Sequence, residues 1–396
     1  MHVPDGFIDA PVSAAAGLVA AGAVALSLKG ARRELGGAAG SSVAGSGGER
    51  TAPLAGLVAA FIFAVQMLNF PVAAGTSGHL LGGALAAILI GPFTGVLCVS
   101  VVLLMQGVLF ADGGLTALGV NITDMAVVTT VVAYVVFRGL VKVLPCGRRS
   151  VTAASFVAAL LSVPAAAVAF TLIYAVGGTT DVSLTKVATA MVGVHILIGV
   201  GEAAITALTV GAVIAVRPDL VYGARGLTRP LKLRVGGELV DAPTATAPTP
   251  SAAPARSHRK VWLAGIATSL VLAGVVSFYA SGNPDGLEKV AHDKGIDKKT
   301  QDHATADSPL ADYGVKDITD ARLSGGLAGV IGVGVTVVAG SAVFWALRRR
   351  RAGEASAVAV PEADVRPGAA GATGTAGAAG VGEAGGAGGR AASGEV

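Results

Sequence analysis

The stretch 151–176, VTAASFVAALLSVPAAAVAFTLIYAV, contains no charged residue. It is longer than the roughly 20 apolar residues that a helix needs to cross the hydrocarbon layer of a membrane. Outward from it, the same criterion predicts spans near 11–29, 52–70, 78–92, 93–111, 120–143 and 187–216, and a separate pair near 261–280 and 325–347. The sequence therefore predicts an all-α integral membrane protein, in which a seven-helix body precedes a two-helix membrane hairpin module.

The composition supports a membrane protein. Charged residues make up 14% of the 396 residues, whereas soluble domains hold roughly 25%. The apolar residues are mainly Ala, Val, Leu and Gly with few aromatics, and the small residues among them let helices approach closely in lipid. The net charge is only +4, so we expect no nucleic-acid partner. Cys98 and Cys146 lie too far apart for a disulfide framework or a CxxC metal site.

The chain divides by composition into four parts. We predict a metal-binding membrane body at 1–225, a Pro/Ala/Thr-rich cytoplasmic linker at 226–258, an accessory module at 259–351 with an outer loop at 281–324, and a disordered Gly/Ala-rich tail at 352–396.

Sidedness follows from the basic clusters, because Lys and Arg concentrate in cytoplasmic loops. With the N-terminus outside and the C-terminus in the cytoplasm, every cluster falls on the cytoplasmic side of the cell membrane: 29–50, 138–149, 217–234, 259–260 and 348–351. This orientation brings the polar stretches 1–6, 69–79 and 111–121 together on the outer side. No basic region precedes the first apolar run, so we expect no signal peptide and a retained Met1 amine.

The first two residues carry three nitrogen donors. The Met1 amine, the His2 backbone nitrogen and the His2 Nδ1 atom can close two fused chelate rings on one cation, and His79 in GTSGHLLGG is the obvious fourth donor. Square-planar nitrogen sites favour Ni(II) or Cu(II). These donors bind metal only when they have lost their protons, so the affinity should fall at acid pH. The alternative is that His79 caps a helix beside the lipid headgroups.

Other polar residues could support such a site. Asp112, Asn121 and Asp124 lie near a span boundary, where they could orient imidazoles or cap the next helix; capping is favoured for Asp112. His195 and Glu202 lie two turns apart on one face of the seventh span. Ionisable groups within a span suggest a pathway, coupling or ligand role, and the alternative is a polar pair that joins helices.

The first predicted helix carries a ridge of small residues at a spacing of four, namely Ser13, Gly17, Ala21 and Ala25. Such a ridge permits close packing of helices. It could face a partner subunit or another helix of the same chain.

No GxxxxGK[ST] phosphate loop, HExxH or GxSxG motif occurs in the sequence. We therefore expect a protein that is not an enzyme and does not hydrolyse ATP. Uphill transport would then need an energising partner.

Four separated motifs occur in the order found in a known family: MHVPDGF at the N-terminus, NFPVAAGTSGHLLGGALAAILIGPF at 69–93, LGVNITDMAVV at 118–128 and HILIGVGEA at 195–203. Residues 1–220 thus resemble the CbiM/NikM family, the substrate-binding subunits of energy-coupling-factor (ECF) cobalt and nickel transporters. NPDGLE at 283–288 resembles a PDGLE/NikN-type accessory component. Thr123 and Asp124 depart mildly from the family pattern.

The resemblance implies an importer for Co²⁺ or Ni²⁺, which is the transported substrate and not a cofactor. It implies metal ligands from the Met1 amine, the His2 nitrogens and His79. The implied partners are an ECF transmembrane coupling subunit and cytoplasmic ABC ATPases. Fusion to the PDGLE-type module slightly favours nickel over cobalt. The outer loop, with His292 and His303, could assist metal loading or could simply be solvated.

Two other functions fit parts of the sequence. A passive divalent-metal channel or facilitator needs a polar path across the body, for which only His195 and Glu202 lie at mid-depth. A membrane metalloenzyme would hold a catalytic metal with His79, His195 and Glu202, and would need an open coordination position.

Overall fold

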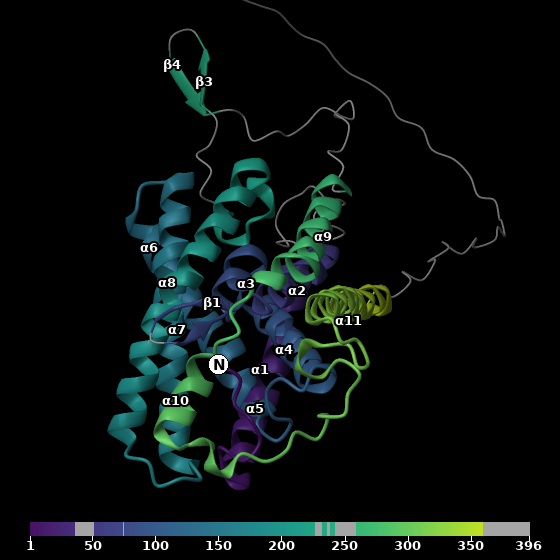
Figure 1. Ribbon diagram of the computed structural model, residues 1–396. Helices are drawn as coiled ribbons and strands as arrows, with labels where there is room; N and C mark the ends of the chain where they lie inside the picture. The colour runs from purple at the N-terminus through teal and green to yellow at the C-terminus, as the bar shows by residue number, and fades with distance from the viewer. Residues whose placement is uncertain (36–50, 74, 226–231, 236–237, 242–258, 359–396) are drawn as a thin grey trace, which may run out of the picture. The chain divides into compact units, whose positions relative to one another are not determined.

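The computed structural model describes residues 1–35, 51–73, 75–225, 232–235, 238–241 and 259–358. Helices occur within all seven spans predicted for the body (Figure 1): α1 (Ala10–Leu35), α2 (Thr51–Gln66), α3 (Gly83–Ile90), α4 (Pro92–Leu109), α5 (Leu118–Asn121) continued by the π-helical turns of Ile122–Val128 and by α6 (Thr129–Val143), α7 (Arg148–Gly177) and α8 (Leu184–Val216). Two short antiparallel strands, β1 (Phe70–Pro71) and β2 (Ser77–Gly78), precede α3.

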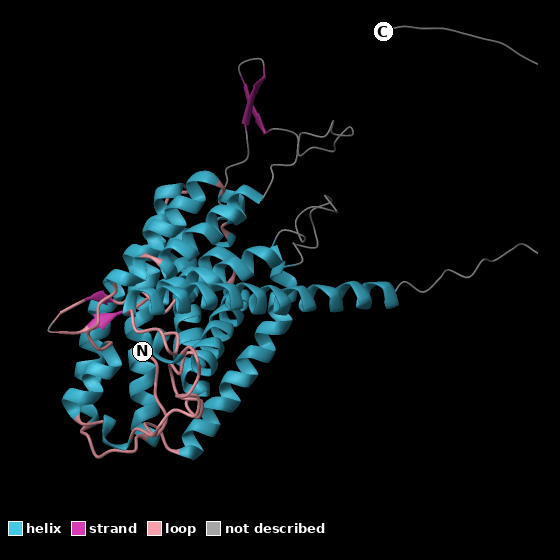
Figure 2. Cartoon of the chain, turned by 45° about the vertical axis from the view of Figure 1, so that its right-hand side comes forward, coloured by secondary structure: helices cyan, strands magenta, loops and turns pink. Residues whose placement is uncertain are grey.

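The prediction of an all-α membrane protein is confirmed. Among the described residues, seven helical segments are long and apolar enough to cross a membrane, five in the body and two after it. Figure 2 shows the described chain as helices joined by loops, with strands only in two short hairpins.

The third segment differs from the predicted span of 78–92. Helix α3 has only eight residues, all buried, so it is about 12 Å long at a rise of 1.5 Å per residue. Gly82 and Gly91 flank it with φ values of 89° and 101°, which favour glycine. A helix buried on all sides is apolar all round, and for this reason its sequence looks like part of a span.

The first half of the small-residue ridge of α1 packs against another helix of the chain, and the second half is exposed. Ser13 is buried, and a Cβ added to Gly119 of α5 would lie 2.4 Å from the Cα atom of Gly17. Ala21 and Ala25 are exposed on the described chain. The first half of the ridge therefore packs within the chain, and a docking role for the ridge stays a prediction.

The C-terminal module consists of α9 (Arg259–Gly274), a 3₁₀ turn (Val276–Tyr279), α10 (Gly286–Lys294), two further 3₁₀ turns (Asp297–Lys299 and Ala311–Tyr313) and α11 (Ala321–Val358). Helix α9 packs on α2 and α10 packs on α8. Residues Met1–Glu354 form one compact unit, so the domain limits stay predictions.

Part of the predicted linker forms an antiparallel hairpin of β3 (Lys232–Val235) and β4 (Glu238–Asp241). Its two runs, KLRV and ELVD, flank a Gly-Gly pair, a combination that favours a hairpin. Residues 352–358, the start of the predicted disordered tail, instead continue α11. The other linker residues, and residues 359–396 of the predicted tail, lie outside the described part of the chain.

Candidate metal centre

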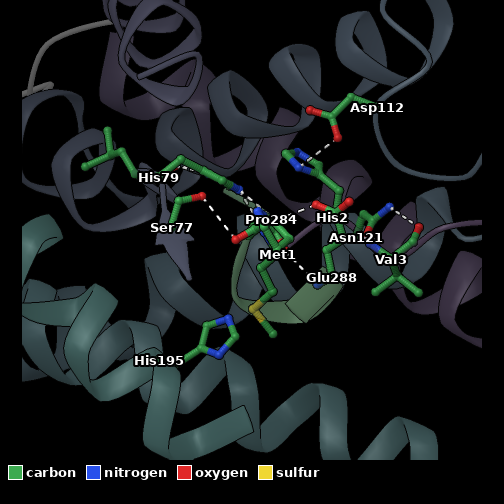
Figure 3. Close-up of polar contacts among 12 residues, drawn as sticks. Met1, His2, Val3, Ser77, His79, Asp112, Asn121, His195, Pro284 and Glu288 are labelled. Atoms are coloured by element: carbon green, nitrogen blue, oxygen red, sulfur yellow. Dashed lines mark hydrogen bonds and ion pairs between the residues drawn. The ribbon is translucent and has the colours of Figure 1, made fainter. Parts of the chain in front are cut away.

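The N-terminal segment lies inside the body. Met1 and Val3 are 3% and 0% exposed. The Val3 N–H donates to the Asn121 side-chain oxygen at 2.7 Å, and the Asn121 amide donates back to the Val3 carbonyl at 3.1 Å (Figure 3). The carboxylate of Asp5 accepts the Thr116 N–H at 2.8 Å. These bonds hold the start of the chain against the segment that precedes and forms α5.

Three donor atoms from distant parts of the chain lie close together: the Met1 amine nitrogen, His79 Nε2 and Asp285 Oδ2. The Met1 nitrogen lies 2.8 Å from His79 Nε2 (Figure 3). It lies 2.6 Å from Asp285 Oδ2, and the His79 and Asp285 atoms are 3.5 Å apart. The His2 ring stacks on the His79 ring with 5.1 Å between centroids. His2, His79 and Asp285 each offer one donor atom within 4.8 Å of the others, so they could bind one ion together.

The structure fixes the orientation of His79. Its Nδ1 atom lies 3.0 Å from the Leu80 carbonyl. Since a carbonyl only accepts, Nδ1 carries the proton and Nε2 presents its lone pair toward the amine. Glu202 of α8 accepts the N–H groups of Leu81 and Gly82 at 2.6 and 3.1 Å. Glu202 therefore fixes the backbone that follows His79.

Polar contacts also orient His2. Its Nδ1 atom lies 3.1 Å from Asp112 Oδ1, and its Nε2 atom lies 3.2 Å from Gln106 Oε1. Tyr313 of the C-terminal module donates to the other oxygen of Asp112 at 2.6 Å and accepts from Gln106 at 2.9 Å. Asp112 was expected to cap a helix, but it contacts His2 instead because its loop folds back over the N-terminus.

The PDGLE-type segment closes the site from the other side. Ser77 donates its N–H to the Pro284 carbonyl at 2.9 Å and its hydroxyl to the Asn283 carbonyl at 2.8 Å. Asp285 is the N-cap of α10 and forms a capping box with Glu288. Together with the body, this segment lines a cavity of about 1150 Å³ that includes His2, His79, Asp112, Asp285 and Tyr313.

Burial and charge set the protonation of the groups outside the helices. Burial lowers the pKa of His2 to about 4, although Asp112 acts in the opposite direction. Burial tends to raise the pKa of Asp285, but the Met1 ammonium and His79 outweigh it and hold that pKa well below its ordinary range. At neutral pH the site thus presents a neutral imidazole at His2 and an ionised carboxylate at Asp285.

We expect acid to destabilise the chain through His2. Between pH 4 and 6.5 the unfolded chain binds a proton at His2 that the folded chain does not, so stability falls as the pH falls through this window. At about 1.4 kcal/mol per pH unit, the full effect is about 3 kcal/mol. Thermal unfolding in the presence of a chelator should show this loss, and the variant His2→Gln should show a smaller one. An equal loss in both proteins would contradict the assignment to His2.

The structure places the other predicted polar residues outside the cluster. Asp124 is 1% exposed, and neither carboxylate oxygen has a hydrogen-bond partner in the described chain. His195 lies beside the Met1 side chain (Figure 3). Its Nδ1 atom lies 2.7 Å from the Met191 carbonyl, and its Nε2 atom has no partner among the described residues. His195 and Glu202 therefore each have separate partners and do not form a pair.

The two histidines of the outer loop differ. His292 is exposed and lies 3.2 Å from Asp297. The Nε2 atom of His303 lies 3.1 Å from the Gly113 carbonyl, so this part of the loop packs on the body and is not merely solvated.

Sequence reasoning did not identify Asp285, Gln106 or Tyr313 as site residues. The spacing of Asp285 and Glu288 does match a helix-capping pattern, but a capping pattern gives no indication of a contact with the N-terminus. The motif NPDGLE marks this segment in the sequence, but its contact with the N-terminus becomes apparent only in the fold.

Two family models match the chain. The model described as the cobalt uptake substrate-specific transmembrane region, CbiM, matches residues 2–220, and the PDGLE domain matches residues 259–349. A putative metal transport protein of Haloquadratum walsbyi is 39% identical over 222 residues, which cover 56% of this chain and 94% of the relative. A putative fused nickel transport protein, NikMN, of Archaeoglobus fulgidus is 38% identical over 221 residues, which cover 56% of this chain and 68% of the relative.

A solved structure of a transition metal transporter aligns with a TM-score of 0.47 and 24% identity, over 57% of this chain and 100% of that chain.

Proposed function

Because this chain belongs to the CbiM family and continues into a PDGLE domain, we propose that it is the substrate-capture membrane subunit of an ECF-type importer for Co²⁺ or Ni²⁺. Two relatives of this chain are named as a putative fused nickel transport protein and a cobalt transport protein. The ion would bind through the Met1 amine, the His2 nitrogens and His79, with the N-terminus on the outer face of the cell membrane.

One observation carries this proposal. The Met1 amine and His79 Nε2, from positions 78 residues apart in sequence, lie 2.8 Å apart, and both residues are buried. Two donors bound in adjacent positions, each about 2.0–2.1 Å from a metal, are about 3 Å apart. The amine and imidazole therefore lie at the separation that two neighbouring ligands of one ion require.

The surrounding contacts support a rigid site. Asn121 forms two hydrogen bonds with Val3, and Glu202 accepts two N–H groups beside His79. Partners that orient ligands in this way commonly contribute 10–100-fold to metal affinity. Because Glu202 holds the backbone next to His79, it is a positioning residue here. This arrangement supports metal capture over a catalytic metal ligated by Glu202.

The importer would also need a transmembrane coupling subunit and cytoplasmic ABC ATPases, which supply the energy. Nitrogen donors accept both ions, and the fused PDGLE domain slightly favours nickel.

Uptake of radioactive Ni²⁺ and Co²⁺ tests this function. Cells that lack their own uptake systems would express the chain together with its candidate coupling subunit and ATPases, or the chain alone. We expect accumulation against the gradient only with the complete set, and its loss when the phosphate-loop lysine of the ATPases is replaced. Equal uptake by the chain alone, down the gradient, would contradict the proposal and favour a passive facilitator.

A further inference from the structure

We propose that Asp285 of the PDGLE segment is itself a ligand of the transported ion, so that the captured metal is bound by the body and the fused module together. This inference rests on the proposed metal capture at the N-terminus. It adds a carboxylate oxygen to a ligand set of nitrogens.

The geometry around the amine carries the inference. Met1 N, His79 Nε2 and Asp285 Oδ2 form a triangle with sides of 2.8, 2.6 and 3.5 Å. Three donors on one face of a metal ion, each about 2.0–2.2 Å from it, form a triangle with sides of about 3 Å. The carboxylate oxygen is therefore as well placed as either nitrogen to bind the same ion.

The two oxygens of Asp285 have separate roles. Oδ1 accepts the Glu288 N–H at 2.8 Å and so caps α10, whereas Oδ2 points at the amine. The cap fixes the carboxylate before any ion arrives, and a donor that is already oriented loses little freedom on binding. The two Ser77 bonds to Asn283 and Pro284 tether the same segment within two residues of His79.

Charge gives a second, independent reason. Met1, His2 and His79 are largely buried, and their nitrogens supply only one negative charge, that of the deprotonated His2 backbone nitrogen, against a doubly charged ion in a site of low polarity. Burying a charge without a compensating partner is costly. The ionised carboxylate of Asp285, with a side chain that is 16% exposed, supplies one opposite charge in direct contact.

A carboxylate ligand changes the expected coordination. The nitrogen set of the proposed site includes the deprotonated His2 backbone nitrogen and favours a four-coordinate square plane for Ni²⁺, in which the ion is diamagnetic. An added oxygen ligand favours five or six coordination, in which Ni²⁺ is paramagnetic. The magnetic state and the X-ray absorption edge of bound Ni²⁺ therefore report on Asp285 independently of transport.

The test uses the purified full chain loaded with one equivalent of Ni²⁺, in wild type and in the variants Asp285→Asn and Asp285→Ser. Both Asn and Ser are good N-caps, so α10 keeps its cap while the carboxylate is lost. Glu288→Gln is the matched control, because it removes one negative charge from the same capping box but none from the triangle of donors.

We expect wild type and Glu288→Gln to hold Ni²⁺ with an oxygen ligand and in the paramagnetic state. Both Asp285 variants should shift Ni²⁺ toward the diamagnetic four-coordinate state and bind it at least about tenfold more weakly. Unchanged coordination and affinity in the Asp285 variants, or tighter binding, would overturn the inference while leaving metal capture intact. Failure of the wild-type chain to bind Ni²⁺ or Co²⁺ would overturn both.

Discussion

Replacement of His79 by alanine is expected to reduce the affinity for Ni²⁺ by more than about 100-fold, because even residues that only orient a metal ligand contribute 10–100-fold. His79 Nε2 lies 2.8 Å from the Met1 amine, and its imidazole is only 6% exposed. The other imidazole of the cluster, His2, is adjacent to Met1 in sequence, so His79 is the imidazole that comes to the amine from a distant part of the chain. Equilibrium dialysis with radioactive Ni²⁺ measures this loss directly.

His292→Ala is the matched control for His79→Ala. It also removes one histidine from the same side of the molecule, but His292 is exposed and contacts Asp297 instead of the amine. We expect wild-type affinity in this variant. A loss of similar size in both variants would show that these histidines bind Ni²⁺ nonspecifically, and wild-type affinity in His79→Ala would remove His79 from the ligand set.

The variant Glu202→Ala should both destabilise the chain and weaken metal binding. It leaves the N–H groups of Leu81 and Gly82 buried without their acceptor. Each unpaired buried group costs about 1–3 kcal/mol, so we expect a loss of about 2–6 kcal/mol. The same change frees the backbone beside His79, which should lower the Ni²⁺ affinity about 10–100-fold. Thermal unfolding and dialysis measure the two effects.

The variant Glu34→Ala is a control that distinguishes loss of stability from loss of Ni²⁺ affinity. Glu34 is a second buried carboxylate that accepts backbone N–H groups, from Phe93 and Thr94 at 3.2 and 2.7 Å, at the start of α4. Its removal should destabilise the chain by a similar amount without changing the Ni²⁺ affinity of the folded protein. If Glu34→Ala weakened Ni²⁺ binding as much as Glu202→Ala, the role of Glu202 in positioning His79 would be wrong.

The length of the apolar segments predicted most of the helices, because lipid requires long apolar segments whose backbone groups are satisfied internally. The same rule predicted α3 too long. The eight buried residues of α3 are as apolar as a span, and only the glycine conformations at Gly82 and Gly91 distinguish the two. The hydropathy of a segment therefore does not tell whether a helix is buried inside the protein or crosses the lipid.

The candidate site was predictable where it depends on local chemistry. Two residues at the N-terminus offer chelating nitrogens by themselves, and the turn-rich stretches at 69–79 and 111–121 do pack around them. Contacts between residues far apart in the sequence could not be predicted from the sequence alone. Asp285 lies 284 residues from the amine. For Glu202 the sequence left open a supporting role near the site, a pathway, coupling or ligand role, and a pair that joins helices, whereas the fold shows that it holds the backbone after His79. Such pairings depend on tertiary packing, which no local pattern encodes.

The most direct test of metal capture by the N-terminus is a calorimetric titration of Ni²⁺ into the full chain and into the variant His2→Gln. The substitution lies outside every helix and keeps the Met1 amine 2.8 Å from His79 Nε2, but it removes the imidazole that closes the second chelate ring. We expect tight binding of one ion by the wild type and loss of that binding in the variant. Binding of equal affinity in both proteins would contradict the proposed site.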